Sequence, residues 1–269
     1  MLKAEPENND ARFWLAVAQA EQGRWVEAAK LFEEGRTKES TNPRWVLAQV
    51  ALFTRDGKEQ EARKILESEL EKQGPKQELL ARFAELQIQM KDGAGAIKTY
   101  DRLLSMAGNN LNYRLGRAGA AALAGNRDAA LRQYSELQKD HASDLRVWLQ
   151  PAALLGEMGR DDEAKLAYSE VLKRDSENAF ALNNLAWLML RRGEEPRHAL
   201  EYVQRAKRTV RQSPEVDGTL AEAYLKLDMN RNAIAVYQEM LSYMPAADKP
   251  KIEKLLESAR RRGRKEGNS

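Results

Sequence analysis

The chain has 269 residues, of which 42% are hydrophobic, 7% aromatic and 32% charged, and its formal net charge is +3. This apolar share is enough to build a core, so the composition excludes a wholly disordered chain. Because the sequence has no cysteine, it excludes disulfides, thiolate catalysis and thiolate metal sites. No apolar run reaches the length of a membrane-spanning helix, so we expect no membrane span.

The most informative pattern is an alanine followed four residues later by a large residue. A second series of alanines lies about one third of a repeat upstream, and a glycine often lies between the two series. This pattern predicts pairs of amphipathic helices joined by a short turn, in which glycine ends the first helix. The pairs recur at intervals of 34 residues, with one of 35: Ala28/Phe32, Ala62/Leu66, Ala96/Tyr100, Ala130/Tyr134, Ala164/Tyr168, Ala199/Val203 and Ala233/Tyr237.

The side-chain sizes in this repeat predict how the helix pairs pack. Small alanines on both helices let the two backbones approach closely, and large residues such as Phe32 and Tyr134 fill the space between one pair and the next. One helix pair cannot bury its own apolar face, so the repeats must stack. We therefore predict an all-α repeat protein.

The pattern resembles the tetratricopeptide repeat family, which favours alanine, aromatic residues and a late proline at set positions of a 34-residue unit. The resemblance covers nearly the whole chain. It implies a right-handed α-solenoid of seven helix-turn-helix repeats with a C-terminal capping helix. The last repeat carries the matching residues Leu220, Ala221, Tyr224, Ala233, Tyr237 and Pro245, and the fifth carries Trp148, Ala152, Gly159, Ala164 and Tyr168.

In chain order, we expect residues 1–8 to be the remnant of a preceding repeat. Residues 246–262 are expected to form the capping helix, and 263–269 a disordered basic tail. Pro151 falls inside the first helix of the fifth repeat, where it predicts a kink or a shortened helix. The repeats between these ends are placed at 9–42, 43–76, 77–110, 111–144, 145–178, 179–213 and 214–247.

The sequence offers little for catalysis. It has no phosphate-binding loop, nucleophile elbow or zinc-binding helix motif. The two histidines, His141 and His198, lie in different repeats without a partner at ligand spacing. We therefore expect no catalytic residue, no metal and no cofactor. The basic cluster at 260–265 is interpreted as a solvated tail, because it lacks aromatic residues for base stacking, and no nucleic-acid partner is expected.

The family geometry implies that the first helix of each repeat lines a concave groove. One candidate cluster is a stripe around Trp187 at helical spacing, rich in residue types that dominate binding interfaces. The other is an apolar patch near the N-terminus. The alternatives are that Trp187 packs against a neighbouring repeat and that the patch is a repeat interface. The predicted groove residues are Phe180, Asn183, Asn184, Trp187, Arg191, Leu149, Leu115, Glu222, Phe13, Val17 and Leu47.

The main functional hypothesis is a non-enzymatic scaffold that binds a partner protein or peptide in the groove. Some members of the family hold a peptide carboxylate with a clamp of lysine, asparagine and arginine. Asn183 and Asn184 could supply the asparagine part, but Glu215 and Thr219 stand where basic residues are needed. The clamp is therefore incomplete, and we do not predict binding of a C-terminal carboxylate.

Two other hypotheses stay open. The run from Asn183 to Leu188 resembles repeat regions of bacterial envelope proteins that act in exopolysaccharide assembly or export. In that case the chain would lie in the periplasm or envelope, and the groove would receive a biosynthetic enzyme or the polysaccharide itself. Alternatively, the repeats are the specificity module of a larger enzyme.

Overall fold

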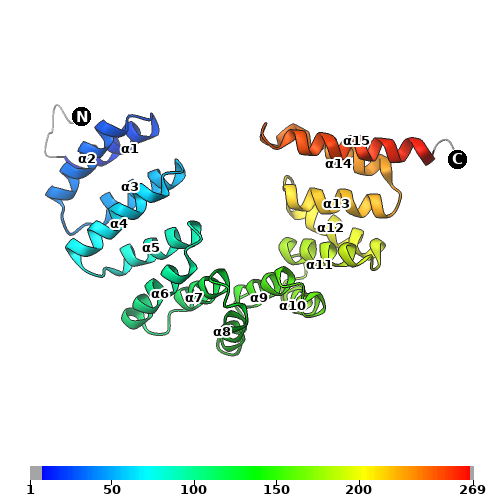
Figure 1. Cartoon of the computed structure of the whole chain (residues 1–269), viewed down its shortest axis with the longest axis horizontal. Coiled ribbons are helices and arrows are strands. Elements are labelled where there is room, and N and C mark those ends of the chain that lie inside the picture. Colours follow the sequence, from blue (N-terminus) through cyan, green and yellow to red (C-terminus); the bar gives the residue numbers. More distant parts are fainter. Residues whose placement is uncertain (1–7, 267–269) are drawn as a thin grey trace. The chain divides into compact units, whose positions relative to one another are not determined.

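The computed structural model describes residues 8–266, and these form fifteen α-helices and no β-strand (Figure 1). The prediction of an all-α architecture of helix-turn-helix repeats followed by a C-terminal helix is confirmed. The helices are α1 (Asn9–Glu21), α2 (Trp25–Lys38), α3 (Arg44–Arg55), α4 (Glu59–Gln73), α5 (Gln77–Gln89), α6 (Gly93–Ala107), α7 (Leu111–Leu123), α8 (Arg127–Asp140), α9 (Arg146–Glu157), α10 (Asp161–Arg174), α11 (Ala179–Arg192), α12 (Pro196–Thr209), α13 (Pro214–Lys226), α14 (Asn230–Tyr243) and α15 (Lys249–Glu266).

The chain divides into two compact units, residues 1–133 and 134–269, and the division falls inside α8. The predicted remnant at 1–8 lies outside the described residues except for Asn8, whose side chain accepts a hydrogen bond from the Ala11 amide and caps α1. Helix α15 continues to Glu266 rather than ending at Arg262. Its arginines and lysines are good helix formers, and only Gly263 interrupts them there.

The turns within the hairpins explain the glycines between the two alanine series. Gly57, between α3 and α4, has a φ of 72°, in the left-handed region that a side chain disfavours. The turn between α5 and α6 reaches the same region at Lys91, with a φ of 60°, so here a residue with a side chain ends the first helix. The chain reverses at both places over the same short distance.

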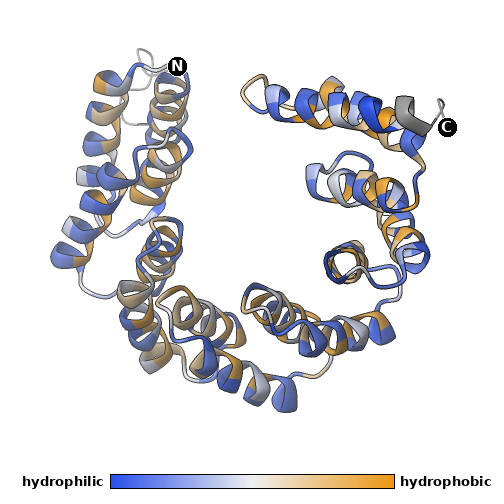
Figure 2. Ribbon diagram, turned by 45° about the vertical axis from the view of Figure 1, so that its right-hand side comes forward, coloured by the Kyte–Doolittle hydropathy of each residue, from blue (hydrophilic) through white to orange (hydrophobic). Residues whose placement is uncertain are grey.

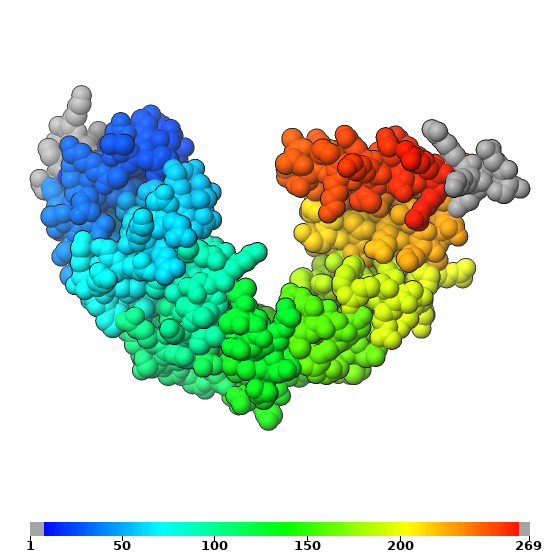
Figure 3. Space-filling model, in the orientation of Figure 1, coloured from blue at the N-terminus to red at the C-terminus, as the bar shows by residue number. Residues whose placement is uncertain are grey.

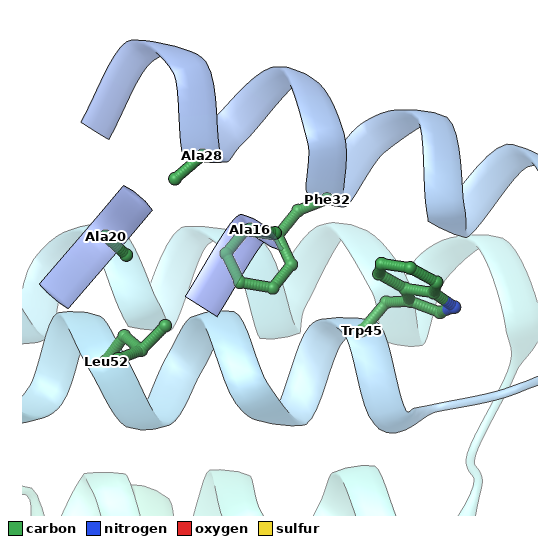
Figure 4. Close-up of a cluster of buried hydrophobic side chains, with 6 residues drawn as sticks. All are labelled: Ala16, Ala20, Ala28, Phe32, Trp45 and Leu52. Atoms are coloured by element: carbon green, nitrogen blue, oxygen red, sulfur yellow. The ribbon is translucent and has the colours of Figure 1, made fainter. Parts of the chain in front are cut away.

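In the first unit, α1 contacts α2 and α3, and α3 contacts α4 and α5. The hydrophobic residues of these helices face neighbouring helices (Figure 2). Trp45 on α3 is fully buried against Phe32 of α2 and Phe13 of α1, whose rings meet it edge to face. The cluster around it, drawn in Figure 4, consists of Ala16, Ala20, Ala28, Phe32, Trp45 and Leu52. Large and small residues therefore fill the space between hairpins as the repeat predicts.

Glu39, directly after α2, joins the first three helices through its carboxylate. It accepts hydrogen bonds from Trp45 Nε1 at 2.9 Å and from Asn9 Nδ2 at 3.0 Å. Arg44 Nη2 lies 2.9 Å from the same carboxylate. The Trp45 hydrogen bond is the main cause that holds the pKa of Glu39 below its usual value, with Asn9 and Arg44 adding to it against the effect of burial.

In the second unit, each helix from α9 to α15 contacts the next one in the chain, and α11 also contacts α9 and α13. The helices succeed one another from green through yellow to red in Figure 3. The alanines of the repeat are fully buried at these contacts, as at Ala164, Ala199 and Ala233. Asp217 on α13 is fully buried. Its carboxylate accepts a hydrogen bond from Tyr243 at 2.6 Å and pairs with Lys207 at 2.6 Å, which links α12, α13 and α14.

Helix α9 continues through Pro151, so it does not end at the proline, and with 12 residues it is as short as α3. Proline has no amide hydrogen, which leaves the carbonyl of Val147, four residues earlier, without its helical donor. The side chain of Gln138 on α8 donates to this carbonyl at 3.0 Å. The helix tolerates a buried proline because a neighbouring amide side chain replaces the missing donor.

Candidate functional site

The second unit contains a groove of about 1350 Å³. Residues of α9, α11, α13 and α15 line it, and tyrosines of α10 and α14 reach it from behind. Three of these helices are the first helices of their repeats, which is the face that the family geometry implies. The fourth, α15, packs on α14 and extends the same wall.

Helix α11 supplies the most exposed apolar surface of the groove. Its first turn is capped by the Asn178 side chain, which accepts from the Ala181 amide at 3.0 Å. From there, residues three and four apart fall on one face of the helix. Phe180 is 52% exposed and Trp187 is 38% exposed, and both line the groove. The alternative that Trp187 is buried in a repeat interface does not match this exposure.

Trp187 is held in place by the neighbouring turn of α11. The guanidinium carbon of Arg191 lies 4.3 Å from the centre of the Trp187 ring, in a cation–π contact. The same guanidinium forms an ion pair with Asp161 at the start of α10. The indole therefore presents a fixed apolar surface, while the Arg191 charge is already balanced within the protein.

The two asparagines of the stripe differ. Asn184 donates through Nδ2 to the carbonyl of Phe180 at 2.7 Å, so its donor is used within the helix. Asn183 is only 8% exposed and lines the groove, and its Oδ1 has no hydrogen-bond partner among the described residues. A buried amide oxygen without a hydrogen-bond partner is unfavourable by about 1–3 kcal/mol. This makes Asn183 a polar group for which a ligand could supply the missing bond.

The back of the groove is aromatic. Tyr168 lies edge to face against Phe180, with ring centres 6.3 Å apart. Burial raises the pKa of Tyr168, and Glu157 raises it further. Burial and Glu222 raise the pKa of Tyr237, against a smaller lowering by Arg262. Both phenols stay protonated near neutral pH, so they add apolar surface and a neutral hydroxyl rather than charge.

The structure brings six of the predicted groove residues into this one site: Phe180, Asn183, Asn184, Trp187, Arg191 and Glu222. The other predicted residue of this unit, Leu149, is half-buried on α9 and is not among the residues that line it. Ile252 and Leu255 also line the groove, and they are not among the predicted groove residues because the sequence predicts the C-terminal helix only as a cap. Their spacing on one face of an amphipathic helix is the signal that could have indicated a second role for this helix.

The remaining predicted groove residues belong to the first unit. Leu115 on α7 is 3% exposed, which corrects its assignment to a groove surface: it is a core residue. Phe13 and Val17 are half-buried against the cluster around Trp45, and Leu47 packs against the next cluster, around Leu66. The helical periodicity of apolar residues does not reveal which of them a neighbouring hairpin covers. The sequence therefore could not distinguish groove residues from core residues.

Within residues 8–266, no group of three or more histidine, aspartate or glutamate side chains is placed to hold a metal ion. No helix in the same range is both long enough and apolar enough to cross a bilayer.

Comparison with known proteins agrees with the fold. The family model described as tetratricopeptide repeat matches residues 1–43 and 152–215. Searching curated proteins by sequence gives no match.

Solved structures with similar folds come from distant organisms. A tetratricopeptide repeat protein of Parabacteroides merdae superposes with a TM-score of 0.68 at 17% identity, covering 93% of this chain and 98% of that one. Yeast Tom70 gives a TM-score of 0.77 at 14% identity, over 98% of this chain and 57% of Tom70. A thermophilic protein of the same repeat class from Thermus thermophilus gives 0.55 at 17% identity, over 68% of this chain and all of that one. At these identities the likeness concerns the fold alone. The alanine repeat, the helix pairs and the partial family match agree with this likeness, and together they give the chain the fold of tetratricopeptide repeat proteins.

Proposed function

We propose that the chain is a non-enzymatic interaction scaffold that binds a peptide segment of a partner protein in the groove of the second unit. The observation that carries this proposal is the combination of two exposed aromatic side chains, Phe180 and Trp187, with the unpartnered amide oxygen of Asn183 on the same helix. Tetratricopeptide repeat proteins typically act as such scaffolds, which supports the general class of function.

The groove suits a peptide for physical reasons. Its walls are helices held by their own packing, so little of the binding energy is spent on ordering the receptor. Tryptophan is among the side chains most enriched in binding hot spots, and here Arg191 already holds the indole in place. The amide of Asn183 can pair with a main-chain group of an extended peptide, which would remove an unsatisfied buried polar group.

Capture of a C-terminal carboxylate is not part of the proposal. Glu215 is acidic, and the hydroxyl of Thr219 donates to the Glu215 carbonyl at 2.9 Å. Arg191 is paired with Asp161. None of these groups is a free cation that would hold a carboxylate.

The test is a comparison of two truncations of exposed apolar residues in the second unit. Peptides would first be selected from a phage-displayed random library on the full chain, and the affinity of a selected peptide would be measured by calorimetry. Trp187→Ala should weaken it at least about tenfold, as expected for a hot-spot tryptophan. The matched control is Leu166→Ala, which removes a 69% exposed side chain on α10 outside the groove and should leave affinity unchanged. Equal affinity of both variants would contradict the site.

A polysaccharide partner is a second candidate, because two exposed aromatic side chains, Phe180 and Trp187, line the groove and could stack on sugar rings. A glycan array probed with the full chain tests it. Binding of a glycan that Trp187→Ala abolishes would favour this candidate, and the absence of any bound glycan would leave the peptide as the ligand.

A further inference from the structure

Acidic residues outnumber basic residues in the lining of the groove. Its acidic residues are Glu157, Glu215, Glu222 and Asp248, and its basic residues are Arg191 and Lys251. Since Arg191 is committed to Asp161, Lys251 is the only lining cation in the described part of the chain that is not already in an ion pair. The groove therefore has an excess of negative charge.

These carboxylates lack the partners that acids elsewhere in the unit have. Glu163 is paired with Arg160, Glu170 with Lys173 and Arg174, and Glu194 with Lys165. By contrast, Glu157, Glu222 and Asp248 form no ion pair with any described residue. The Glu215 carboxylate is bonded by the Ser213 hydroxyl, at 2.8 Å, and by its own backbone amide, and neither donor is charged.

Two of the unpaired carboxylates act on the aromatic back of the groove. The charge of Glu157 raises the pKa of Tyr168, and that of Glu222 raises the pKa of Tyr237 by more than Arg262 lowers it. Glu157 is on α9 and Glu222 is on α13, and α11, which carries Phe180 and Trp187, contacts both of these helices. All four residues line the same groove. A ligand seated on the aromatic side chains would therefore have acidic groups available from the flanking helices.

An acidic cluster is common on protein surfaces, and a second observation points to a ligand here. Asn183 is more than nine-tenths buried, lines the groove, and has an Oδ1 without a partner in the described structure. Its amide can pair with the main chain of a bound segment, whatever the side chains of that segment are. Asn183 thus indicates a peptide, and the carboxylates indicate its charge.

We propose that the groove selects a cationic, amphipathic peptide segment, which places apolar side chains on Phe180 and Trp187 and lysine or arginine side chains beside Glu157 and Glu222. This rests on the proposed function and adds the chemistry of the partner. Unpaired carboxylates attract a basic segment over the range of the Debye length and reject an acidic one by like-charge repulsion.

The experiment pans a phage-displayed random peptide library on the full chain and compares the selected peptides with the starting library. Enrichment of lysine and arginine next to tryptophan, leucine or phenylalanine is the expected result. Selection of peptides without charge bias, or enriched in aspartate and glutamate, would overturn the cationic partner while leaving peptide binding in place. If nothing is enriched, the proposed function and this inference fail together.

A charge-reversal variant makes the assignment specific to the groove. Glu157→Lys/Glu222→Lys should weaken a selected basic peptide at least about tenfold, because an attraction becomes a repulsion at two places. Glu201→Lys/Glu253→Lys is the matched control, since it reverses two charges at exposed residues of the same unit that do not line the groove. It should change affinity less than about twofold. An equal loss in both would show that general charge, rather than the groove, attracts the peptide.

The neutral variant Glu222→Gln guards against a folding artefact of charge reversal. With a helical circular dichroism spectrum like that of the wild type, it should weaken the basic peptide about threefold and flatten the dependence of affinity on salt. Unchanged affinity and an unchanged salt dependence in this folded variant would count against Glu222 as a contact.

Discussion

At the scale of single residues, the junction of the first two hairpins depends on a match between tryptophan and glycine. Gly35 on α2 is buried, and a Cβ added there would overlap the ring of Trp45. The equivalent positions of other repeats carry larger residues, such as Leu103 and Leu137, but here the large indole of the next helix leaves room only for hydrogen. The glycine is therefore required by a close approach rather than by a turn.

Gly35→Ala should lower the free energy of unfolding by about 1–3 kcal/mol, because overpacking exceeds the gain of about 1 kcal/mol from alanine in a helix. Gly218→Ala is the matched control, since Gly218 lies inside α13 and a Cβ there meets nothing within 4 Å. That variant should be as stable as the wild type or more so. Urea unfolding measures both, and a Gly35→Ala protein of undiminished stability would disprove the packing argument.

Glu39 predicts a pH dependence. Its pKa in the folded protein is lowered, mainly by the hydrogen bond from Trp45, so its contribution to stability is present above the unfolded value of about 4.3. It is lost as the pH falls through the folded pKa. Glu39→Gln should destabilise the protein by about 1–2 kcal/mol at neutral pH, and this difference should shrink in acid.

Thermal unfolding of the wild type and of Glu39→Gln, at pH values from neutral to about 3, would measure the difference in their stability. The control is Glu71→Gln, which neutralises an exposed glutamate near the end of α4. A difference between wild type and Glu39→Gln that stays constant with pH would mean that the carboxylate charge is not the cause.

At the scale of elements, α9 shows how a helix accommodates an internal proline. The repair of the Val147 carbonyl by Gln138 couples α8 to α9 through a single hydrogen bond. In a regular helix the amide of residue 151 would serve that carbonyl, and Gln138 would not be needed there.

This coupling predicts the result of a double-mutant cycle. Gln138→Leu should destabilise the wild type by about 1–2 kcal/mol, because it leaves a carbonyl in the helix without a donor. In the Pro151→Ala background the same change should cost little, since the alanine amide restores the helical bond. Equal losses in the two backgrounds, measured by urea unfolding, would show that Gln138 contributes through packing alone.

At the scale of the whole molecule, stability is distributed along the chain. The principal contacts within each unit join helices one or two positions apart in the sequence. In such a repeat protein each hairpin is stabilised by its neighbours, so a local defect is felt over a short distance.

Hydrogen exchange of the Gly35→Ala variant tests this property. Amides of α1 to α3 should exchange faster than in the wild type, because the altered junction lies between these helices. Amides of α11 to α14 should keep their protection. Faster exchange throughout the chain would show that the protein opens as one cooperative unit instead.

The sequence predicted the architecture well because the repeat consists of residues that act on their own helix and on the adjacent one. Alanines such as Ala164 and Ala233 are fully buried where the phase of the repeat placed them. Gly57 ends its helix in the left-handed region. Such residues specify helix, turn and close contact within one hairpin and its neighbour, and they recur often enough to be recognised in a single sequence.

The sequence alone therefore determined the repeat, the helix pairs and the stripe of α11 that carries Trp187. Only the tertiary structure decided which predicted residues share a site, placing Leu115 in a core and joining Leu255 of α15 to the groove. It also decided which charges are free, pairing Arg191 with Asp161 while Glu222 has no ion pair in the described chain. Periodicity fixes the face of a helix on which a residue lies, but burial and pairing depend on the helices that pack against that face.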